Sequence, residues 1–195
     1  MRIPPLFDER RAAQAAAYLL HRAGGRMSLL ALTKLLYLAE RESMRRYAEP
    51  LTGDIPVSME HGPVLSRMLD LTRGMVQSAL PVGGWDAWIT DREGHEVALR
   101  NTAALTNPER DLPSLSRADL DVLAETWEKF GSMVGDPWAL VRWCHKNCHE
   151  WEDPGAGSFP IPVERLLRAV GFDDDQVAAA AERLQDRAYL QHALG

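Results

Sequence analysis

The stretch SLLALTKLLYLAERESMRRY, residues 28–47, carries the strongest helical pattern in the chain and predicts its central helix. Ser28 can cap the start of a helix with its side-chain oxygen. Leucine and alanine then recur at intervals of three and four residues, which predicts a helix that packs these side chains inward and leaves Lys34, Arg41 and Arg45 toward its margins. The inner stripe consists of Leu29, Leu32, Leu36 and Ala39, widened by Leu35 and Leu38.

Helical patterns recur on both sides of this stretch and make up most of the chain. Alanines at helical spacing mark residues 8–22. Ser116 and Asp119 resemble a capping box before another apolar stripe, and Asp136 with Pro137 suits the cap and first turn of a later helix. Helical spacing thus predicts further helices over residues 8–22, 63–76, 116–130, 137–151, 163–170 and 174–190.

Two segments have the character of strands. Residues 49–56 hold two prolines and a glycine, which predicts an extended connection leading to a short strand at Val57–Met59. Residues 85–101 alternate apolar and polar side chains around the turn at 91–94, which predicts a β-hairpin. The predicted fold class is therefore mainly α: a compact helical domain with a small β-hairpin or short antiparallel sheet.

Length and composition suit one packed domain, or a domain with an appendage. A chain of 195 residues with 46% apolar and 26% charged residues can bury a core without a metal or a disulfide. Its start, MRIPPLFDERR, has no apolar signal segment, and no later stretch approaches the roughly 18 apolar residues that a membrane-spanning helix requires. We therefore expect a cytoplasmic protein with no membrane partner.

The net charge of -6 is divided unevenly along the chain. Residues 1–50 hold nine Lys and Arg against five Asp and Glu, whereas the remainder holds thirteen against twenty-three. Nonspecific nucleic-acid binding rests on neutralising phosphates, so this balance argues against a nucleic-acid partner, although a local basic patch could still touch DNA. The acidic part can instead attract a basic protein partner.

The cluster Cys144-His145-Lys146-Asn147-Cys148-His149 raises the question of a metal site. On one helix the two histidines would lie about 100° around from the two cysteines, so the four side chains cannot converge on a tetrahedral zinc ion without help from elsewhere. The cysteine side chains would also point in poor directions for a disulfide. We expect two packed, free thiols, with no metal and no cofactor, and a zinc site completed from elsewhere stays the alternative.

No catalytic signature accompanies this cluster. The sequence has no nucleophile elbow, P-loop, paired-carboxylate signature or Rossmann glycine pattern. A cysteine with a nearby histidine could act as nucleophile and base, but neighbours in sequence are rarely the productive pair. We therefore predict that the protein is not an enzyme.

Three segments, taken together, resemble a known family. They are the helix motif KLLYLAE at 34–40, the loop PLTGD at 50–54 and the turn MEHGPV at 59–64. In order and spacing they are similar to the Panacea domain of SocA-like antitoxins and of phage-associated, GepA-like proteins. His145 and Trp151 resemble the closing histidine helix of that domain and the tryptophan that follows it.

The resemblance implies a domain division and a function. It covers about residues 10–155, so we expect a Panacea domain at 1–155 and a C-terminal helical extension at 156–195 packed on the same body. It implies an antitoxin that neutralises a cognate protein toxin by direct binding, with an adaptor role in delivering that toxin to a protease. A DNA-contacting regulator and a zinc- or thiol-dependent enzyme are the alternatives.

The same resemblance implies a set of partner-binding residues. Lys34, Tyr37 and Arg41 are expected near the surface, and tyrosine and arginine are residue types that often dominate interface energetics. The competing interpretation is that the motif residues hold the helix, loop and helix together. The candidate site consists of Lys34, Tyr37, Arg41, Thr52, Gly53, His61, Gly62, Pro63, His145 and Trp151.

Overall fold

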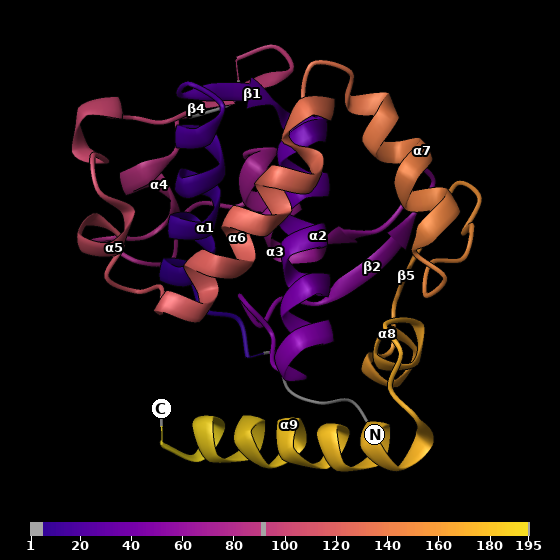
Figure 1. The fold of residues 1–195 in the computed structure, drawn as a ribbon. Coiled ribbons are helices and arrows are strands. Elements are labelled where there is room, and N and C mark those ends of the chain that lie inside the picture. Colours follow the sequence, from indigo (N-terminus) through magenta and orange to yellow (C-terminus); the bar gives the residue numbers. More distant parts are fainter. Residues whose placement is uncertain (1–5, 91–92, 195) are drawn as a thin grey trace.

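Helix α2 (Leu29–Tyr47) runs through the middle of the molecule, with other helices arranged around it (Figure 1). The structure is a computed structural model that describes residues 6–90 and 93–194. The other helices are α1 (Glu9–Arg22), α3 (Ser66–Thr72), α4 (Trp85–Trp88), α5 (Pro108–Asp111), α6 (Arg117–Phe130), α7 (Pro137–Asn147), α8 (Val163–Ala169) and α9 (Asp174–Leu194). Because α1, α3, α6, α7 and α8 all contact α2, this helix organises the core. The predicted mainly α fold is confirmed.

Two small antiparallel sheets accompany the helices. In one, β2 (Pro56–Met59) pairs on one side with β3 (Val64–Leu65) and on the other with β5 (Ser158–Pro160). In the other, β1 (Arg26–Ser28) pairs with β4 (Glu96–Ala98). Strand β2 confirms the short strand that was predicted after the proline-rich connection.

The first half of α2 is buried on all sides. Ser28 caps the helix as predicted, because its Oγ accepts the Ala31 N–H at 3.1 Å. Every residue from 31 to 40 is buried, the polar ones included. An unpaired polar group is costly to bury, so each polar side chain on this stretch requires a partner. Those partners come from parts of the chain that are distant in sequence.

Helices α1 and α6 begin where their capping residues predict. Asp8 accepts the N–H groups of Arg10 and Arg11 at the start of α1. The alanines of α1 are enclosed, and such short side chains allow neighbouring helices to approach closely. Ser116 and Asp119 form the predicted capping box of α6. These caps fix the ends of two helices that cover α2.

Helix α7 begins at Pro137 as predicted but ends earlier than predicted. The Asp136 side chain does not cap it and pairs instead with Arg142 at 2.8 Å. Cys148 leaves the helical conformation, with φ -94° and ψ 81°. Trp151 therefore lies beyond α7, in the segment that leads toward β5.

The helix predicted over residues 63–76 is wrong at both ends, because β3 replaces its first turn and α3 stops at Thr72. The start of α3 is set by Asp54, whose carboxylate accepts two N–H groups from the first turn at 3.1 and 2.9 Å. Met75 and Val76 were expected on the inner face of this helix. They are 73% and 46% exposed.

The hairpin predicted over residues 85–101 is only partly present. The helical turn α4 replaces its first strand, and a buried N–H at the start of that turn donates to Glu9 at 3.0 Å. Ile89 and Leu99 still pair, as an isolated antiparallel bridge. The second predicted strand became β4, whose main partner is β1. Residues 91–92 of the predicted turn lie outside the described residues.

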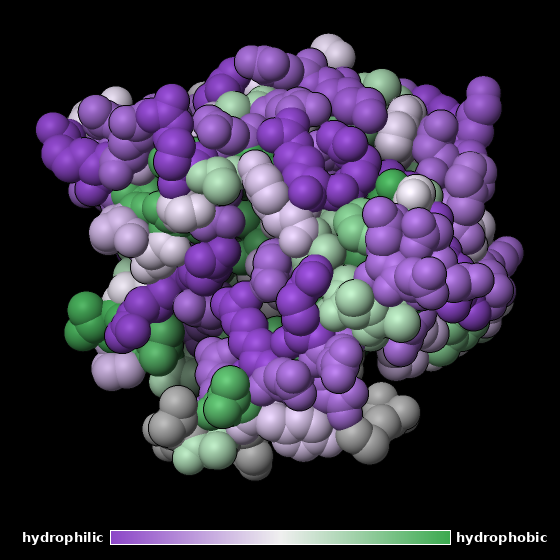
Figure 2. All heavy atoms as spheres, turned by 60° about the horizontal axis from the view of Figure 1, so that its bottom comes forward, coloured by the Kyte–Doolittle hydropathy of each residue, from purple (hydrophilic) through white to green (hydrophobic). Residues whose placement is uncertain are grey.

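The C-terminal segment packs on the rest of the molecule. Strand β5 extends the sheet of β2, and Leu166 and Leu167 of α8 are buried in the core. On α9, Val177 and Leu184 are also part of the core. Seen from the side where α9 lies, the surface is mainly hydrophilic with scattered hydrophobic side chains (Figure 2). Helices α8 and α9 thus contribute to the core, and the division into a domain at 1–155 and an extension at 156–195 stays a prediction.

The last feature of the fold is the hydropathy of its helices. Within residues 6–90 and 93–194, the helices lack the combination of length and apolar character that a membrane crossing demands.

Candidate partner-binding site

Lys34 is fully buried between α2 and the turn formed by Gly62 and Pro63. Its Nζ donates to the Pro63 carbonyl at 2.9 Å, and burial lowers the pKa of this amine to about 8. Gly62 has a φ of +88°, and a Cβ there would lie 3.3 Å from both the Lys34 Nζ and a ring carbon of His145. Glycine thus lets the turn pass between the lysine and the imidazole.

Tyr37 and Arg41, one turn apart on α2, both bind Glu150. The Tyr37 hydroxyl donates to the Glu150 Oε1 at 2.5 Å, and the Arg41 Nε donates to the same oxygen at 2.7 Å. Arg41 also donates to the Asn147 carbonyl at 3.3 Å. Burial, and next the Glu150 carboxylate, raise the pKa of Tyr37 well above its usual range, so the hydroxyl keeps its proton. These contacts tie the segment after α7 to the centre of α2.

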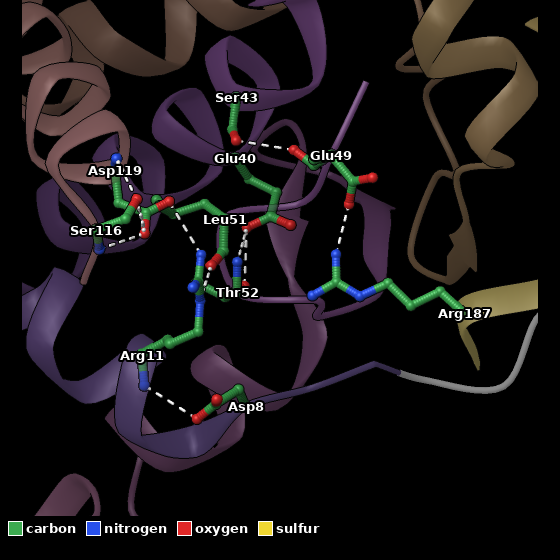
Figure 3. Close-up of polar contacts among 10 residues, drawn as sticks. All are labelled: Asp8, Arg11, Glu40, Ser43, Glu49, Leu51, Thr52, Ser116, Asp119 and Arg187. Carbon is green, nitrogen blue, oxygen red and sulfur yellow. Dashed lines mark hydrogen bonds and ion pairs between the residues drawn. The ribbon is translucent and has the colours of Figure 1, made fainter. Parts of the chain in front are cut away.

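Glu40 holds the PLTGD loop, residues 50–54 (Figure 3). Its carboxylate accepts the Thr52 N–H at 2.9 Å and the Thr52 hydroxyl at 2.8 Å. Burial raises the pKa of Glu40 to about 7. Gly53 has a φ of +73°, and a Cβ at that position would lie 2.3 Å from the Leu6 carbonyl oxygen. Only glycine allows the loop to lie this close to the N-terminal segment.

Two arginines reach the same loop from other elements (Figure 3). Arg11 on α1 donates to the Leu51 carbonyl at 2.8 Å and pairs with Asp119 on α6 at 2.9 Å. Arg187 on α9 pairs with Glu49, just before the loop, at 2.5 Å. The loop is therefore held by α1, α2 and α9.

Most motif residues face inward, and the expectation that Lys34 and Tyr37 lie near the surface is wrong. Both side chains are fully buried, because the first half of α2 is enclosed on all sides rather than packed on one face. The ten candidate residues divide into the buried Lys34, Tyr37, Thr52, Gly62 and Pro63, the half-buried Arg41, Gly53 and Trp151, and the exposed His61 and His145.

The exposed candidates lie within one cluster of aromatic rings. His145 stacks on Trp151, with ring centroids 4.3 Å apart and planes inclined by 13°. His61 meets Trp138 edge to face at 5.0 Å. The two pairs adjoin because the His145 ring lies against Gly62, the residue after His61. We call His61, Trp138, His145 and Trp151 the aromatic–histidine patch.

The geometry of this patch is fixed by polar contacts beneath it. The Trp151 Nε1 donates to the Met59 carbonyl at 2.9 Å, which holds the indole against β2. Partial burial, and next the Lys34 ammonium, lower the pKa of His145, so its ring is mainly neutral at neutral pH. Trp138 remains 49% exposed. Positioned aromatic rings of this kind can bury large areas against a protein partner.

The cysteine and histidine cluster does not converge on one point. Cys144 and Cys148 are free and buried, whereas the His145 and His149 side chains are exposed. In the part of the chain that the structure describes, no group of three or more His, Cys, Asp and Glu side chains could hold a metal ion.

Sequence reasoning did not single out Trp138, Glu40 or Glu150 as site residues. Trp138 could have been found, because it precedes His145 by seven residues and two helical turns return a side chain to the same face. Glu150 gave no local signal, since its partners Tyr37 and Arg41 lie more than a hundred positions away.

The fold and the site together define a class of protein. It is a mainly helical domain in which much of the motif helix α2 is buried, while exposed motif side chains contribute to the aromatic–histidine patch. The sequence profile described as antitoxin SocA-like, Panacea domain, matches residues 32–152, more than half of the chain. The protein therefore belongs to the SocA-like antitoxin family, which confirms the resemblance found in the motifs. No curated protein and no solved structure matches the chain.

Proposed function

We propose that this antitoxin-family protein neutralises a cognate protein toxin by binding it directly through the aromatic–histidine patch. The observation that carries the proposal is the division of the motif residues into two sets. Lys34, Tyr37 and Thr52 already have buried partners, whereas His61 and His145 present their rings at the surface. The buried set supports the turn and the helix end on which the exposed set stands.

The exposed side chains of the patch are of the types that anchor protein–protein interfaces. Interface hot spots are enriched in tryptophan, and truncating one typically costs about 2 kcal/mol or more of binding free energy. Trp138 and Trp151 are held by ring contacts with His61 and His145, so their conformations are largely set before binding. The face over α9 is mainly hydrophilic (Figure 2).

Two further parts of the proposal rest on the family resemblance. We propose that the bound toxin is delivered to a protease, with this protein acting as the adaptor, and that both events take place in the cytoplasm. Neither step requires this chain to catalyse a reaction. Direct binding alone would already block the toxin by covering its active surface.

Growth rescue tests the proposal most simply. Each open reading frame next to the gene for this protein is expressed alone and then together with this chain. We expect one neighbouring frame to arrest growth and the full chain to restore it. If every toxic neighbour still arrests growth in the presence of the chain, the antitoxin function proposed here is wrong.

Matched variants locate the contact. Trp138→Ala and His145→Ala are expected to abolish rescue, and Tyr47→Ala is expected to retain it, because Tyr47 is a similarly exposed aromatic side chain on α2 and outside the patch. Equal thermal stability of the three variants shows that any loss arises at the surface. Full rescue by both patch variants would place the toxin contact elsewhere.

A DNA-contacting regulator is the second candidate, and one observation favours it. Lys146 is exposed on α7 near the patch and has no ion-pair partner among residues 6–90 and 93–194. Against it, the net charge is -6, and Arg142 on the same helix is paired with Asp136. Titration with DNA from the gene's own promoter over a range of salt concentrations distinguishes the two, because phosphate contacts give a steep salt dependence.

A further inference from the structure

A group of reactive side chains lies beneath the patch and has no part in the proposed binding. Cys144 and Cys148 are both buried and free, and the two thiols lie close enough to shift each other's pKa. Lys34 is close enough to act electrostatically on both sulfurs. Among the described residues, Lys34 forms no ion pair with a carboxylate, and its Nζ binds the Pro63 carbonyl. A buried ammonium without a carboxylate favours negative charge on a neighbouring sulfur.

The backbone brings the two cysteine residues next to each other at the end of α7. The sequence-based objection to a disulfide assumed that both cysteines lie within one helix. Cys148 instead leaves α7, with φ -94° and ψ 81°, so its side chain is released from the helical direction. Its N–H still donates to the Cys144 carbonyl at 2.8 Å, which closes a turn of five residues. Such a turn separates the two Cα atoms by about 6 Å, a spacing that disulfides span.

The two sulfurs differ in acidity. Interaction with the Cys148 thiol, and to a smaller extent with the Lys34 ammonium, lowers the pKa of Cys144 against the opposing effect of burial. The same interaction and burial raise the pKa of Cys148 far above its usual range. Cys144, whose thiolate the Lys34 ammonium favours, is the sulfur assigned to react first.

We propose that Cys144 and Cys148 form an oxidation site at which hydrogen peroxide closes a reversible disulfide within the chain. The Cys144 thiolate attacks one peroxide oxygen, the O–O bond breaks, and the departing hydroxide takes up a proton, which leaves a sulfenic acid on Cys144. The Cys148 sulfur then attacks the Cys144 sulfur, the S–O bond breaks, and the hydroxyl leaves as water with the Cys148 proton. The two sulfurs lose two electrons, and one peroxide becomes two waters.

Because the two cysteines lie at the end of α7, peroxide can reach them and their oxidation can affect the neighbouring segment. Peroxide is little larger than water and reaches the thiols when the last turn opens locally, as helix ends do. The bridge constrains Cys148, which stands two residues before Glu150 and three before Trp151. Oxidation therefore acts on the segment that joins the buried contacts of α2 to the patch. The reaction itself requires no toxin and can be measured on the purified chain.

The test uses the reduced full-length protein. After treatment with hydrogen peroxide, free thiols are alkylated and the denatured protein is digested with trypsin, which cuts after Lys146 and so separates the two cysteines. We expect the two cysteine peptides to be recovered joined by a disulfide that reductant releases. Recovery of both peptides alkylated and unlinked, under conditions that oxidise a small-molecule thiol, would overturn the proposal.

Single variants test the order of the steps. In Cys148→Ser, a sulfenic-acid reagent is expected to label Cys144, and in Cys144→Ser it is expected to leave Cys148 unlabelled. The reverse pattern contradicts the assignment of the reacting sulfur. Lys34→Met is expected to slow oxidation of the folded protein, because loss of the buried ammonium raises the pKa of Cys144 and lowers its thiolate fraction. The control Lys146→Met removes an exposed lysine and should leave the rate unchanged.

Discussion

Glu150 shows most clearly what single buried residues do in this protein. Its side chain is 0% exposed and accepts hydrogen bonds from Tyr37 and Arg41. Removing a carboxylate and a guanidinium from water costs several kcal/mol for each ion, and their mutual attraction offsets that cost only while both are present. Each partner therefore depends on the other for its place in the core.

Replacing Glu150 by alanine is expected to lower the free energy of unfolding by about 3 to 5 kcal/mol, because the Arg41 charge and the Tyr37 hydroxyl lose their partner. Chemical denaturation measures this change. The control is Glu152→Ala, since Glu152 is 60% exposed and forms a surface pair with Arg165 at 2.9 Å, so its loss should cost less than about 1 kcal/mol. Equal costs for the two variants would contradict the role assigned to Glu150.

Glu40 gives the protein a pH-dependent stability. Its pKa is about 7 in the folded state against an ordinary value of 4.5. The folded state therefore binds more protons than the unfolded state between these values, and the Glu40 contribution to the free energy of unfolding falls as pH rises from 4.5 to about 7. A shift of this size corresponds to a change on the order of 3 kcal/mol.

The variant Glu40→Gln should remove this pH dependence, because the amide oxygen can still accept from Thr52 and carries no charge. Denaturation midpoints of the two proteins are compared across the acidic to neutral range. We expect the variant to gain stability relative to the native chain as pH rises. Parallel curves for the two proteins would show that Glu40 does not titrate in this range. Lys34 does not interfere, since its pKa is about 8.

At the level of single residues, the sequence motifs identified important side chains but predicted some of them to lie at the surface instead of in the core. The apolar stripe on residues 28–47 predicts that Lys34 and Tyr37 lie away from the core, whereas both are buried. Their partners, Pro63 and Glu150, stand 29 and 113 positions further along the chain. Periodicity reports only neighbours within a helix, so contacts of this range appear only when the tertiary structure is known.

Secondary-structure elements depend on single capping side chains, and Asp54 is the clearest case. Its carboxylate accepts the N–H groups of Ile55, Arg67 and Met68, so one side chain both bends the loop and starts α3. Backbone N–H groups at a helix start have no partner within the helix, and a carboxylate is well suited to them.

Asp54→Ala is expected to lower the free energy of unfolding by about 1 to 2 kcal/mol and to fray α3, because its first N–H groups lose their acceptor. Hydrogen exchange at Arg67 and Met68 should become faster. The control is Asp70→Ala on the same helix, where the side chain is half-buried and the N–H groups of Arg67 and Met68 bind Asp54 instead. Unchanged exchange in the Asp54 variant would show that α3 does not need this cap.

Predictions of elements succeeded where the signal was local. Ser28 and the Ser116–Asp119 capping box mark the starts of α2 and α6, and both helices begin there. The hairpin failed because its second strand pairs with β1, about seventy residues earlier, while Glu9 holds a helical turn in place of the first strand. Helix caps lie beside the helices they start, whereas strand partners can come from any part of the chain.

At the scale of the whole molecule, the C-terminal segment completes the structure of the family domain. The matched residues end at 152, yet β5 (Ser158–Pro160) supplies an outer strand to the sheet of β2, and Ile161 is buried. The proposed division after residue 155 therefore separates the family domain from an extension that contributes to its sheet and core.

Truncation tests this relation. A chain ending at Gly171 lacks α9 but retains β5 and α8, and we expect it to unfold cooperatively with reduced stability. A chain ending at Gly155 loses the outer strand and the buried leucines of α8, so we expect it to lose cooperative unfolding or to aggregate. Circular dichroism during thermal unfolding distinguishes these outcomes. A stable, cooperative chain ending at Gly155 would show that the extension is dispensable for folding.

The candidate site was predicted in part. The motifs led to His61, His145 and Trp151, which belong to the patch, but also to Lys34 and Thr52, which are buried supports. A motif contains both surface residues and buried supporting residues, and nothing in the motif itself distinguishes the two kinds. Burial separates them, and it also adds Trp138, which no motif included.

In the proposed function, the aromatic–histidine patch binds the toxin while the buried motif residues support it. The most direct measurement is a calorimetric titration of the purified cognate toxin with the native chain, Trp138→Ala and the exposed control Tyr47→Ala. We predict that Trp138→Ala weakens binding by at least about tenfold, or about 1.4 kcal/mol, at unchanged thermal stability, and that Tyr47→Ala binds as the native chain does. Equal affinities for all three proteins would contradict the account.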